Sequence, residues 1–109
     1  MAMLATEEHT IQEVKAVVRA HEAAVRAGDL DAVMRNFADD VVTLVSGLPL
    51  VEGRDSARAL YTQMLAAGAW DATHHYAGAA VTADSVVVHG VALGTFTPSG
   101  GEAGPIATR

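Results

Sequence analysis

Apolar residues recur at helical spacing over residues 10–27 and predict a long amphipathic helix. Thr10 and Glu13 have the spacing of a capping box and predict the start of this helix, with Thr6 as an earlier alternative. Gly28 predicts its end, because glycine readily takes the left-handed conformation that follows a helix. The apolar stripe is formed by Ile11, Val14, Val17, Val18, His21, Ala24 and Val25.

Two shorter helices are predicted further along the chain. Asp29 is placed to cap the first of them, whose apolar positions are Leu30, Val33, Met34 and Phe37. The other follows Gly53, with Asp55 as its expected N-cap and Gly68 at its end. Its inner face is predicted to carry Ala57, Leu60, Tyr61, Met64 and Leu65.

The rest of the pattern predicts strands. Residues 41–45 are β-branched and apolar, which indicates a strand buried on at least one face, and residues 50–52 can return beside it. Two long alternating runs, residues 70–81 and 86–97, flank a turn. A final strand can begin at residues 105–109. Helices followed by antiparallel strands predict an α+β fold with the helices on one face of a bent sheet.

Composition narrows the class of protein. The 109 residues fit one domain, residues 1–109, and half of them are hydrophobic, which is enough for a packed core. A net charge of −6 without a basic stripe argues against nucleic acid and anionic membrane as partners. The absence of cysteine excludes disulfides and thiol chemistry. No apolar run reaches the roughly 18 residues of a membrane span, and no signal peptide is recognisable, so we expect a cytoplasmic protein.

Three local motifs resemble a known superfamily. Residues 26–33 read RAGDLDAV, residues 37–41 read FADDV, and residues 53–57 read GRDSA. In this order and spacing they resemble the SnoaL-like and ketosteroid isomerase-like branch of the nuclear transport factor 2-like superfamily, over residues 7–98. The resemblance implies a cystatin-like fold, in which helices and a curved sheet form a cone around an apolar pocket. Members include isomerases, cyclases, dehydratases, hydrolases and non-catalytic association domains, and many are homodimers through the sheet.

The chain departs from this family in two respects. Members usually carry two further long strand segments beyond the point where this sequence stops, so we expect either a shortened chain or a partner that completes the sheet. The carboxylates of ketosteroid isomerase are also missing. The position of its base falls near Leu44, Val45 or Ser46, its tyrosine falls on His21, and its second carboxylate falls near Ala107. We therefore exclude steroid isomerase chemistry for this chain.

The candidate site residues are predicted from the face of the helix or strand on which each one lies. His21 lies on the apolar stripe and is the candidate acid or base, or else a core histidine bonded to a backbone carbonyl. His74 and Tyr76 share one strand face with Trp70, because side chains alternate along a strand, and His75 points the other way. That face either lines the pocket or is exposed on the surface of the sheet. The predicted pocket residues are Val17, Phe37, Tyr61, Trp70, His74 and Tyr76.

Other chemistries lack their motifs. There is no metal-ligand motif, since adjacent His74 and His75 cannot both reach one ion from a regular strand, and no cofactor is expected. Asp39 and Asp40 fit a turn better than a catalytic pair. Two functions stay open: a small enzyme acting on a hydrophobic molecule through His21, or a non-catalytic ligand-binding or homodimerisation domain.

Overall fold

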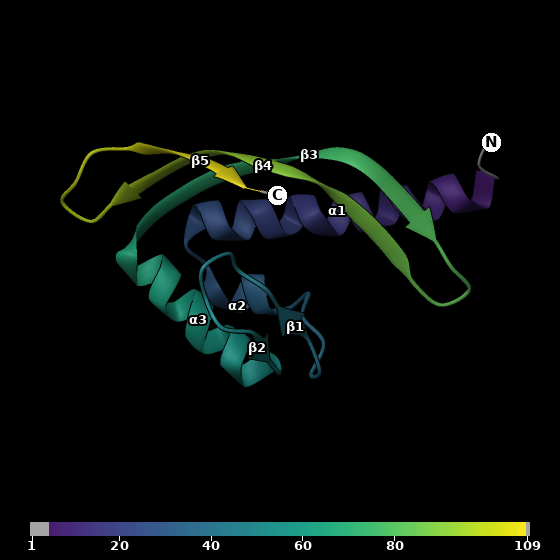
Figure 1. Ribbon diagram of the computed structural model, residues 1–109, viewed down its shortest axis with the longest axis horizontal. Helices are drawn as coiled ribbons and strands as arrows, with labels where there is room; N and C mark the ends of the chain where they lie inside the picture. The colour runs from purple at the N-terminus through teal and green to yellow at the C-terminus, as the bar shows by residue number, and fades with distance from the viewer. Residues whose placement is uncertain (1–4, 109) are drawn as a thin grey trace.

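The computed structural model describes residues 5–108. Its element order is α1 (Ala5–Ala27), α2 (Leu30–Met34), β1 (Val42–Thr43), β2 (Val51–Glu52), α3 (Arg54–Ala67), β3 (Gly68–Val81), β4 (Val86–Pro98) and β5 (Gly104–Thr108). Figure 1 shows the long strands curving along the length of α1, with α2 and α3 below. The α+β fold, with helices packed on one face of a curved antiparallel sheet, is as predicted.

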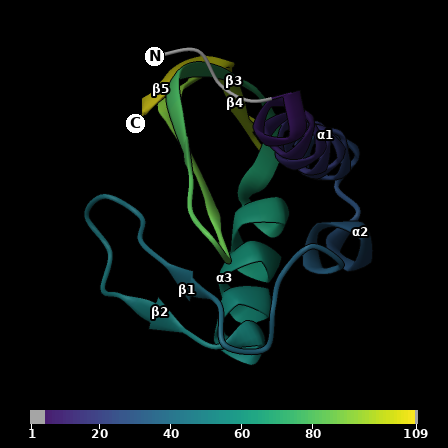
Figure 2. The same cartoon turned by 90° about the vertical axis from the view of Figure 1, so that its right-hand side faces the viewer.

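Two separate sheets make up the β structure. The strands β3, β4 and β5 pair antiparallel in that order, and β1 and β2 form a small antiparallel pair of their own. Tyr76 pairs with Gly90, but Gly78 pairs with His89, so Ala77 is an extra residue on β3. A bulge of this kind bends a strand and increases its twist. Figure 2 shows the separate β1–β2 pair projecting away from the main sheet.

The predicted helix ends are partly right. Gly28, at φ +69°, ends α1, and the Asp29 carboxylate accepts a hydrogen bond from the Ala32 N–H at 3.1 Å, as an N-cap of α2. However, α1 already includes Ala5, so the predicted start at Thr10 is wrong and the earlier alternative at Thr6 is nearer. The expected cap Asp55 is also wrong: Gly53 is the N-cap of α3, without a side-chain hydrogen bond.

The first predicted strand is the largest correction. Of residues 41–45 only Val42 and Thr43 are in a strand, and the expected buried face is only half buried, at Val41, which packs against the core, and Thr43. The Leu44 side chain is 78% exposed, and Val42 and Leu50 are about half exposed. The β1–β2 pair has no sheet beside it within the described residues, so nothing covers these side chains. The predicted last strand is present as β5, although Arg109 lies outside the described residues.

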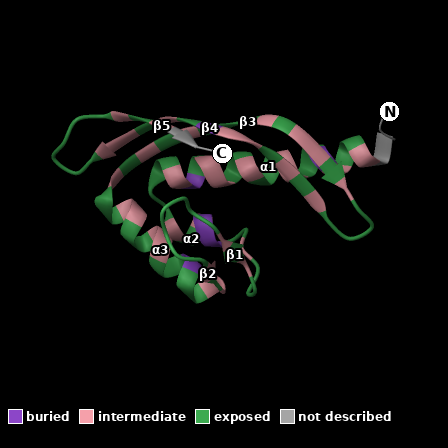
Figure 3. Ribbon diagram, viewed as in Figure 1, coloured by how far each residue is buried: buried purple, intermediate pink, exposed green. Residues whose placement is uncertain are grey.

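The buried core is small and lies between the helices. Val33 and Met34 of α2 are fully buried against Ala24 of α1 and Ala57 of α3. Figure 3 shows how few segments of the described chain are fully buried. Arg54 at the start of α3 donates hydrogen bonds to the carbonyl oxygens of Met34, at 2.9 Å, and Phe37, at 3.3 Å. The three helices are thereby fixed around the end of α2, where Phe37 turns toward the sheet.

Candidate functional site

A cavity of about 650 Å³ lies between α1 and the strands β3 and β4. This volume is within the range of small-molecule sites in proteins. Its walls are mostly apolar, and they come from α1, from the segment after α2 and from β3 and β4. The apolar lining residues are Val17, Val18, Phe37, Val88 and Ala92.

His21 lies at this cavity, on the face of α1 predicted by the apolar stripe. Its Nε2 is 3.4 Å from the hydroxyl of Tyr61 on α3, and both rings pack against Phe37. Burial lowers the pKa of His21, and a charge on His74 lowers it further, against the opposing effect of Glu22. Burial raises the pKa of Tyr61. The pair at neutral pH is therefore a neutral imidazole beside a protonated phenol.

Two buried polar atoms at the cavity have no hydrogen-bond partner among the described residues. They are Nδ1 of His21 and the hydroxyl of Tyr76. Both residues line the cavity. Burial raises the pKa of the Tyr76 hydroxyl, and the Glu22 carboxylate raises it further against the effect of Arg19, so the hydroxyl keeps its proton. Buried polar atoms in proteins are almost always hydrogen-bonded, so these two unpaired atoms are exceptions that a ligand site has to explain.

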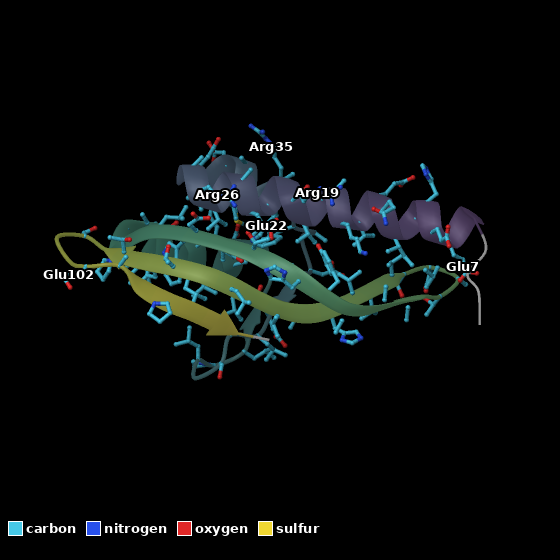
Figure 4. All side chains as sticks on the ribbon, turned by 90° about the horizontal axis from the view of Figure 1, so that it is seen from above. Glu7, Arg19, Glu22, Arg26, Arg35 and Glu102 are labelled. Carbon is cyan, nitrogen blue, oxygen red and sulfur yellow. The ribbon has the colours of Figure 1, made fainter. Side chains whose placement is uncertain are left out.

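A carboxylate–imidazole pair lies beside them. Glu22 on α1 accepts hydrogen bonds through one oxygen, Oε2, from both the backbone N–H of His74, at 2.5 Å, and its ring Nδ1, at 2.8 Å. The Glu22 side chain is only 10% exposed, and Figure 4 shows it between α1 and the sheet. Burial would raise the pKa of Glu22, but the hydrogen bonds from His74 outweigh it, and the pKa lies below its usual value. Glu22 is therefore ionised at neutral pH.

The structure brings most of the predicted pocket residues together. Tyr61 lies behind the cavity wall, in contact with His21 and Phe37. Trp70 lies elsewhere: its ring packs on Phe96 at 4.2 Å between centroids, and its indole N–H donates to the Met64 carbonyl at 2.7 Å. The predicted residues that line the cavity are Val17, His21, Phe37, His74 and Tyr76. Ligand binding by these residues stays a prediction.

Sequence reasoning missed Glu22 and Asn36, which also lines the cavity. Glu22 follows His21 directly, one position off the apolar stripe. Its only signal in the sequence is an acidic residue next to a stripe that already carries a histidine. Its partner His74 is 52 residues away, so only the packing of α1 on β3 shows the pair.

Four of the five histidines contribute to the cavity lining, namely His21, His74, His75 and His89, although strand alternation predicted that His75 points away from the face of His74. Even so, no group of three or more histidine, aspartate or glutamate side chains within residues 5–108 is arranged to hold a metal ion. In the same part of the chain, no helix is long and apolar enough to span a bilayer.

The fold and the cavity together define a protein of the nuclear transport factor 2-like class. Residues 18–107 match the SnoaL-like domain family, which is most of the chain. The chain belongs to this family, as its three motifs predicted. None of the curated proteins matches the sequence.

Solved structures agree on the fold. A ketosteroid isomerase-like protein from Erwinia carotovora atroseptica has 24% identity and a TM-score of 0.75 over 85% of this chain and 73% of that one. A proposed dehydratase of the NTF2-like family from Streptomyces avermitilis has 18% identity and a TM-score of 0.72, over 93% and 80%. A proposed calcium/calmodulin dependent protein kinase II association domain from Xanthomonas campestris has 22% identity and a TM-score of 0.76, over 87% and 69%. Identities this low carry the fold and no more.

Proposed function

We propose that this SnoaL-like chain binds a small hydrophobic molecule in the cavity between α1 and the sheet, and that His21 serves there as hydrogen-bonding or acid–base group. The observation that carries the proposal is the pair of unpartnered buried atoms, His21 Nδ1 and the Tyr76 hydroxyl, at a mostly apolar cavity. An apolar cavity with a few converging polar groups is typical of a ligand site.

The arrangement favours an apolar ligand that carries at least one polar atom. Such a ligand would pack against Val17 and Phe37 and would give the unpartnered atoms a hydrogen bond each. Both atoms are already buried and unpaired in the free chain, at a cost of about 1–3 kcal/mol for each group, and a wholly apolar ligand would not relieve that cost. The neutral imidazole of His21 suits either role, because it offers one donor and one acceptor nitrogen.

A thermal shift screen tests the proposal. Small aromatic and alicyclic ketones, phenols and their deoxygenated analogues are compared at equal concentrations, since a ligand of the native state raises the melting temperature. We expect the oxygenated compounds to raise it more than their hydrocarbon analogues, and Val17→Arg, which fills the cavity with a charge, to abolish the shift. If no compound in any class shifts the melting temperature, the proposal is wrong.

Self-association is a second candidate, and it is favoured by the exposed surface. The chain exposes 7344 Å², whereas a compact monomer of its mass exposes about 5,700 Å². The radius of gyration, 15.0 Å, likewise exceeds the roughly 13 Å of a compact domain of this length. Val87, at 56%, and Leu93, at 45%, are exposed large apolar side chains on β4. We therefore propose a homodimer through the sheet.

Sedimentation at several concentrations tests the dimer. We expect a dimer for the wild-type chain and a monomer for Leu93→Lys, with a melting temperature that rises with concentration only in the wild type. A monomer at all concentrations would exclude self-association as a function and would leave the cavity proposal untouched. We also propose, as a separate point, that the protein is located in the cytoplasm.

A further inference from the structure

The ring of His74 is held in one tautomer by Glu22. An ionised carboxylate can only accept hydrogen bonds, so the Nδ1 that lies 2.8 Å from Glu22 Oε2 must carry the proton. In the neutral ring the lone pair is then on Nε2. No hydrogen bond to His74 Nε2 is found within residues 5–108, and His74 lines the cavity.

The second hydrogen bond makes this arrangement rigid. The backbone N–H of His74 donates to the same Oε2, so the carboxylate is fixed to the strand as well as to the ring. Glu22 is largely buried, which reduces screening by water and keeps its negative charge close to the imidazole. The carboxylate orients the ring and stabilises the imidazolium that forms when Nε2 takes a proton.

We propose that His74 is a proton acceptor at the cavity, with Glu22 as its positioning residue, and that the ligand carries an acidic hydroxyl of the phenol or enol class. This inference rests on the proposed ligand cavity and assigns its base. The ligand O–H bond breaks, the proton goes to Nε2 of His74, and the electron pair stays on the ligand oxygen. The imidazolium formed is paired with the Glu22 carboxylate, so no other reactant is needed.

The neighbouring groups suit the anion that results. His21 from α1 and Tyr76 from β3 both line the cavity and have unpartnered atoms there. If the Tyr61 hydroxyl donates to His21 Nε2, the neutral ring carries its proton on Nδ1, which is then an unpaired donor. Arg26 acts on Glu22 and is paired with Asp71 at 2.9 Å, outside the cavity lining. Lys15 lies over the Tyr76 ring, 4.9 Å from its centroid, and is also outside that lining. Among the residues that line the cavity, the ligand anion is therefore matched by protonated His74.

The first experiment reads the tautomer in the wild-type protein. Nitrogen-15 chemical shifts of the imidazole distinguish protonated from unprotonated ring nitrogens. We expect neutral His74 to be protonated on Nδ1, and Glu22→Gln to shift it toward the Nε2-protonated form that free histidine prefers. A wild-type His74 protonated on Nε2 would overturn the inference without any question of whether a variant folds.

The second experiment uses 4-nitrophenol, whose phenolate is yellow, and its methyl ether 4-nitroanisole, which has no proton to give. Calorimetry measures binding of both, and absorbance measures phenolate formation at a pH below the pKa of the free phenol. We expect both to bind the wild type and nitrophenol to bind as phenolate. His74→Gln should bind both without phenolate, and Glu22→Gln should lower the phenolate-to-phenol ratio, because the imidazolium loses its paired carboxylate.

The matched control is Glu13→Gln. Glu13 also pairs with a histidine, His9, at 2.7 Å, but both side chains are exposed and outside the cavity lining. We expect this variant to behave as the wild type. Binding of both compounds with no phenolate, or with phenolate that persists in His74→Gln, would overturn the inference and leave the proposed function standing. If neither compound binds, the cavity proposal fails and the inference fails with it.

Discussion

Glu22 accepts two hydrogen bonds from a single residue, His74, through one carboxylate oxygen. The two residues are 52 positions apart, and their contact joins the inner face of α1 to the middle of β3. The same contact fixes the side chain of His74 at the cavity. One ionised group therefore contributes both to the packing of the helix on the sheet and to the chemistry of the site.

The substitution Glu22→Gln is expected to reduce the free energy of unfolding at neutral pH. Loss of a hydrogen bond to a charged group costs about 1.5–3 kcal/mol, and the glutamine amide can restore only part of the interaction. Chemical denaturation of both proteins at pH 7 measures the difference. Glu13→Gln, in the exposed pair with His9, should change stability by less than about 1 kcal/mol.

The effect of Glu22 also depends on pH. Its folded-state pKa lies below the ordinary value of 4.5, so its contribution is complete above that pH and is lost as the pH falls through the folded-state pKa. The gap in stability between wild type and Glu22→Gln should therefore close below pH 4.5. A gap that stays constant down to acid pH would show that the carboxylate charge has no part in it.

His21 makes the free energy of unfolding depend on pH in a higher pH range than Glu22 does. Its folded-state pKa is lowered, chiefly by burial, so below the ordinary value of 6.5 the unfolded chain binds more protons than the folded one. The stability of the wild type is therefore expected to fall from about pH 6.5 downward, until the pH reaches the folded-state pKa of His21. Denaturation midpoints between pH 8 and pH 5 measure this slope.

The variant His21→Phe keeps an aromatic ring against Phe37 and Tyr61 but cannot be protonated. In this variant the free energy of unfolding should depend less steeply on pH, because the contribution of His21 is missing. His9→Gln removes an exposed histidine on the same helix and should keep that slope. An unchanged slope in His21→Phe would show that His21 is not the group responsible.

Local patterns predicted the helices and long strands because each depends on neighbours in the sequence. Ile11 and Ala24 of the stripe are buried as their spacing indicates, although Val17 is 46% exposed, and the glycine at position 28 ends α1. The prediction for residues 41–45 failed because strand burial depends on a second layer. A run of β-branched residues indicates an extended conformation, but it does not supply the sheet that would cover Leu44.

The site was predictable only in part, for a related reason. The face of His21 follows from helical spacing and that of His74 from strand alternation. The contact of Glu22 with His74 depends on where along β3 the helix packs, and the sequence has no local signal for that. Trp70 shares the strand face of His74, but it lies near the start of β3, where it meets Met64 and Phe96. Strand alternation predicts a face and not a position along it.

Arg54 is expected to support the cavity from below. Its guanidinium donates to the carbonyl oxygens of Met34 and Phe37, and Phe37 lines the cavity. Arg54→Met should lower the free energy of unfolding by about 1.5–3 kcal/mol, because two hydrogen bonds from a charged group are lost. Arg54→Lys should recover little, since an ammonium group lacks the planar fork that reaches both carbonyls. Denaturant titration of the two variants measures the change in the free energy of unfolding for each.

Arg58 provides the matched control for that prediction. It lies one turn further along α3 and pairs with Asp31 at 2.8 Å, but both side chains are largely exposed. Exposed ion pairs contribute about 0–1 kcal/mol, so Arg58→Met should have a small effect. Equal losses for Arg54→Met and Arg58→Met would show that the carbonyl contacts of Arg54 do not matter to stability.

Gly94 is expected to tolerate no side chain. It lies in the central strand β4, paired with Ala72 on one side and Ile106 on the other. A Cβ atom at Gly94 would lie 1.8 Å from the carbonyl oxygen of Asp71 and 2.7 Å from Cα of Ala72. Both are backbone atoms, so the strands themselves would have to move apart. Gly94→Ala should therefore lower the free energy of unfolding by about 3 kcal/mol.

Gly104 offers the comparison at the edge of the same sheet. It begins β5, and a Cβ atom there would meet nothing within 4 Å. Gly104→Ala should be neutral or stabilising by about 0.4–1 kcal/mol, because alanine restricts the unfolded chain and causes no clash. Thermal and denaturant unfolding of the two variants separate the cases. Equal stabilities for Gly94→Ala and Gly104→Ala would contradict the close approach of β3 to β4 on which the cavity wall depends.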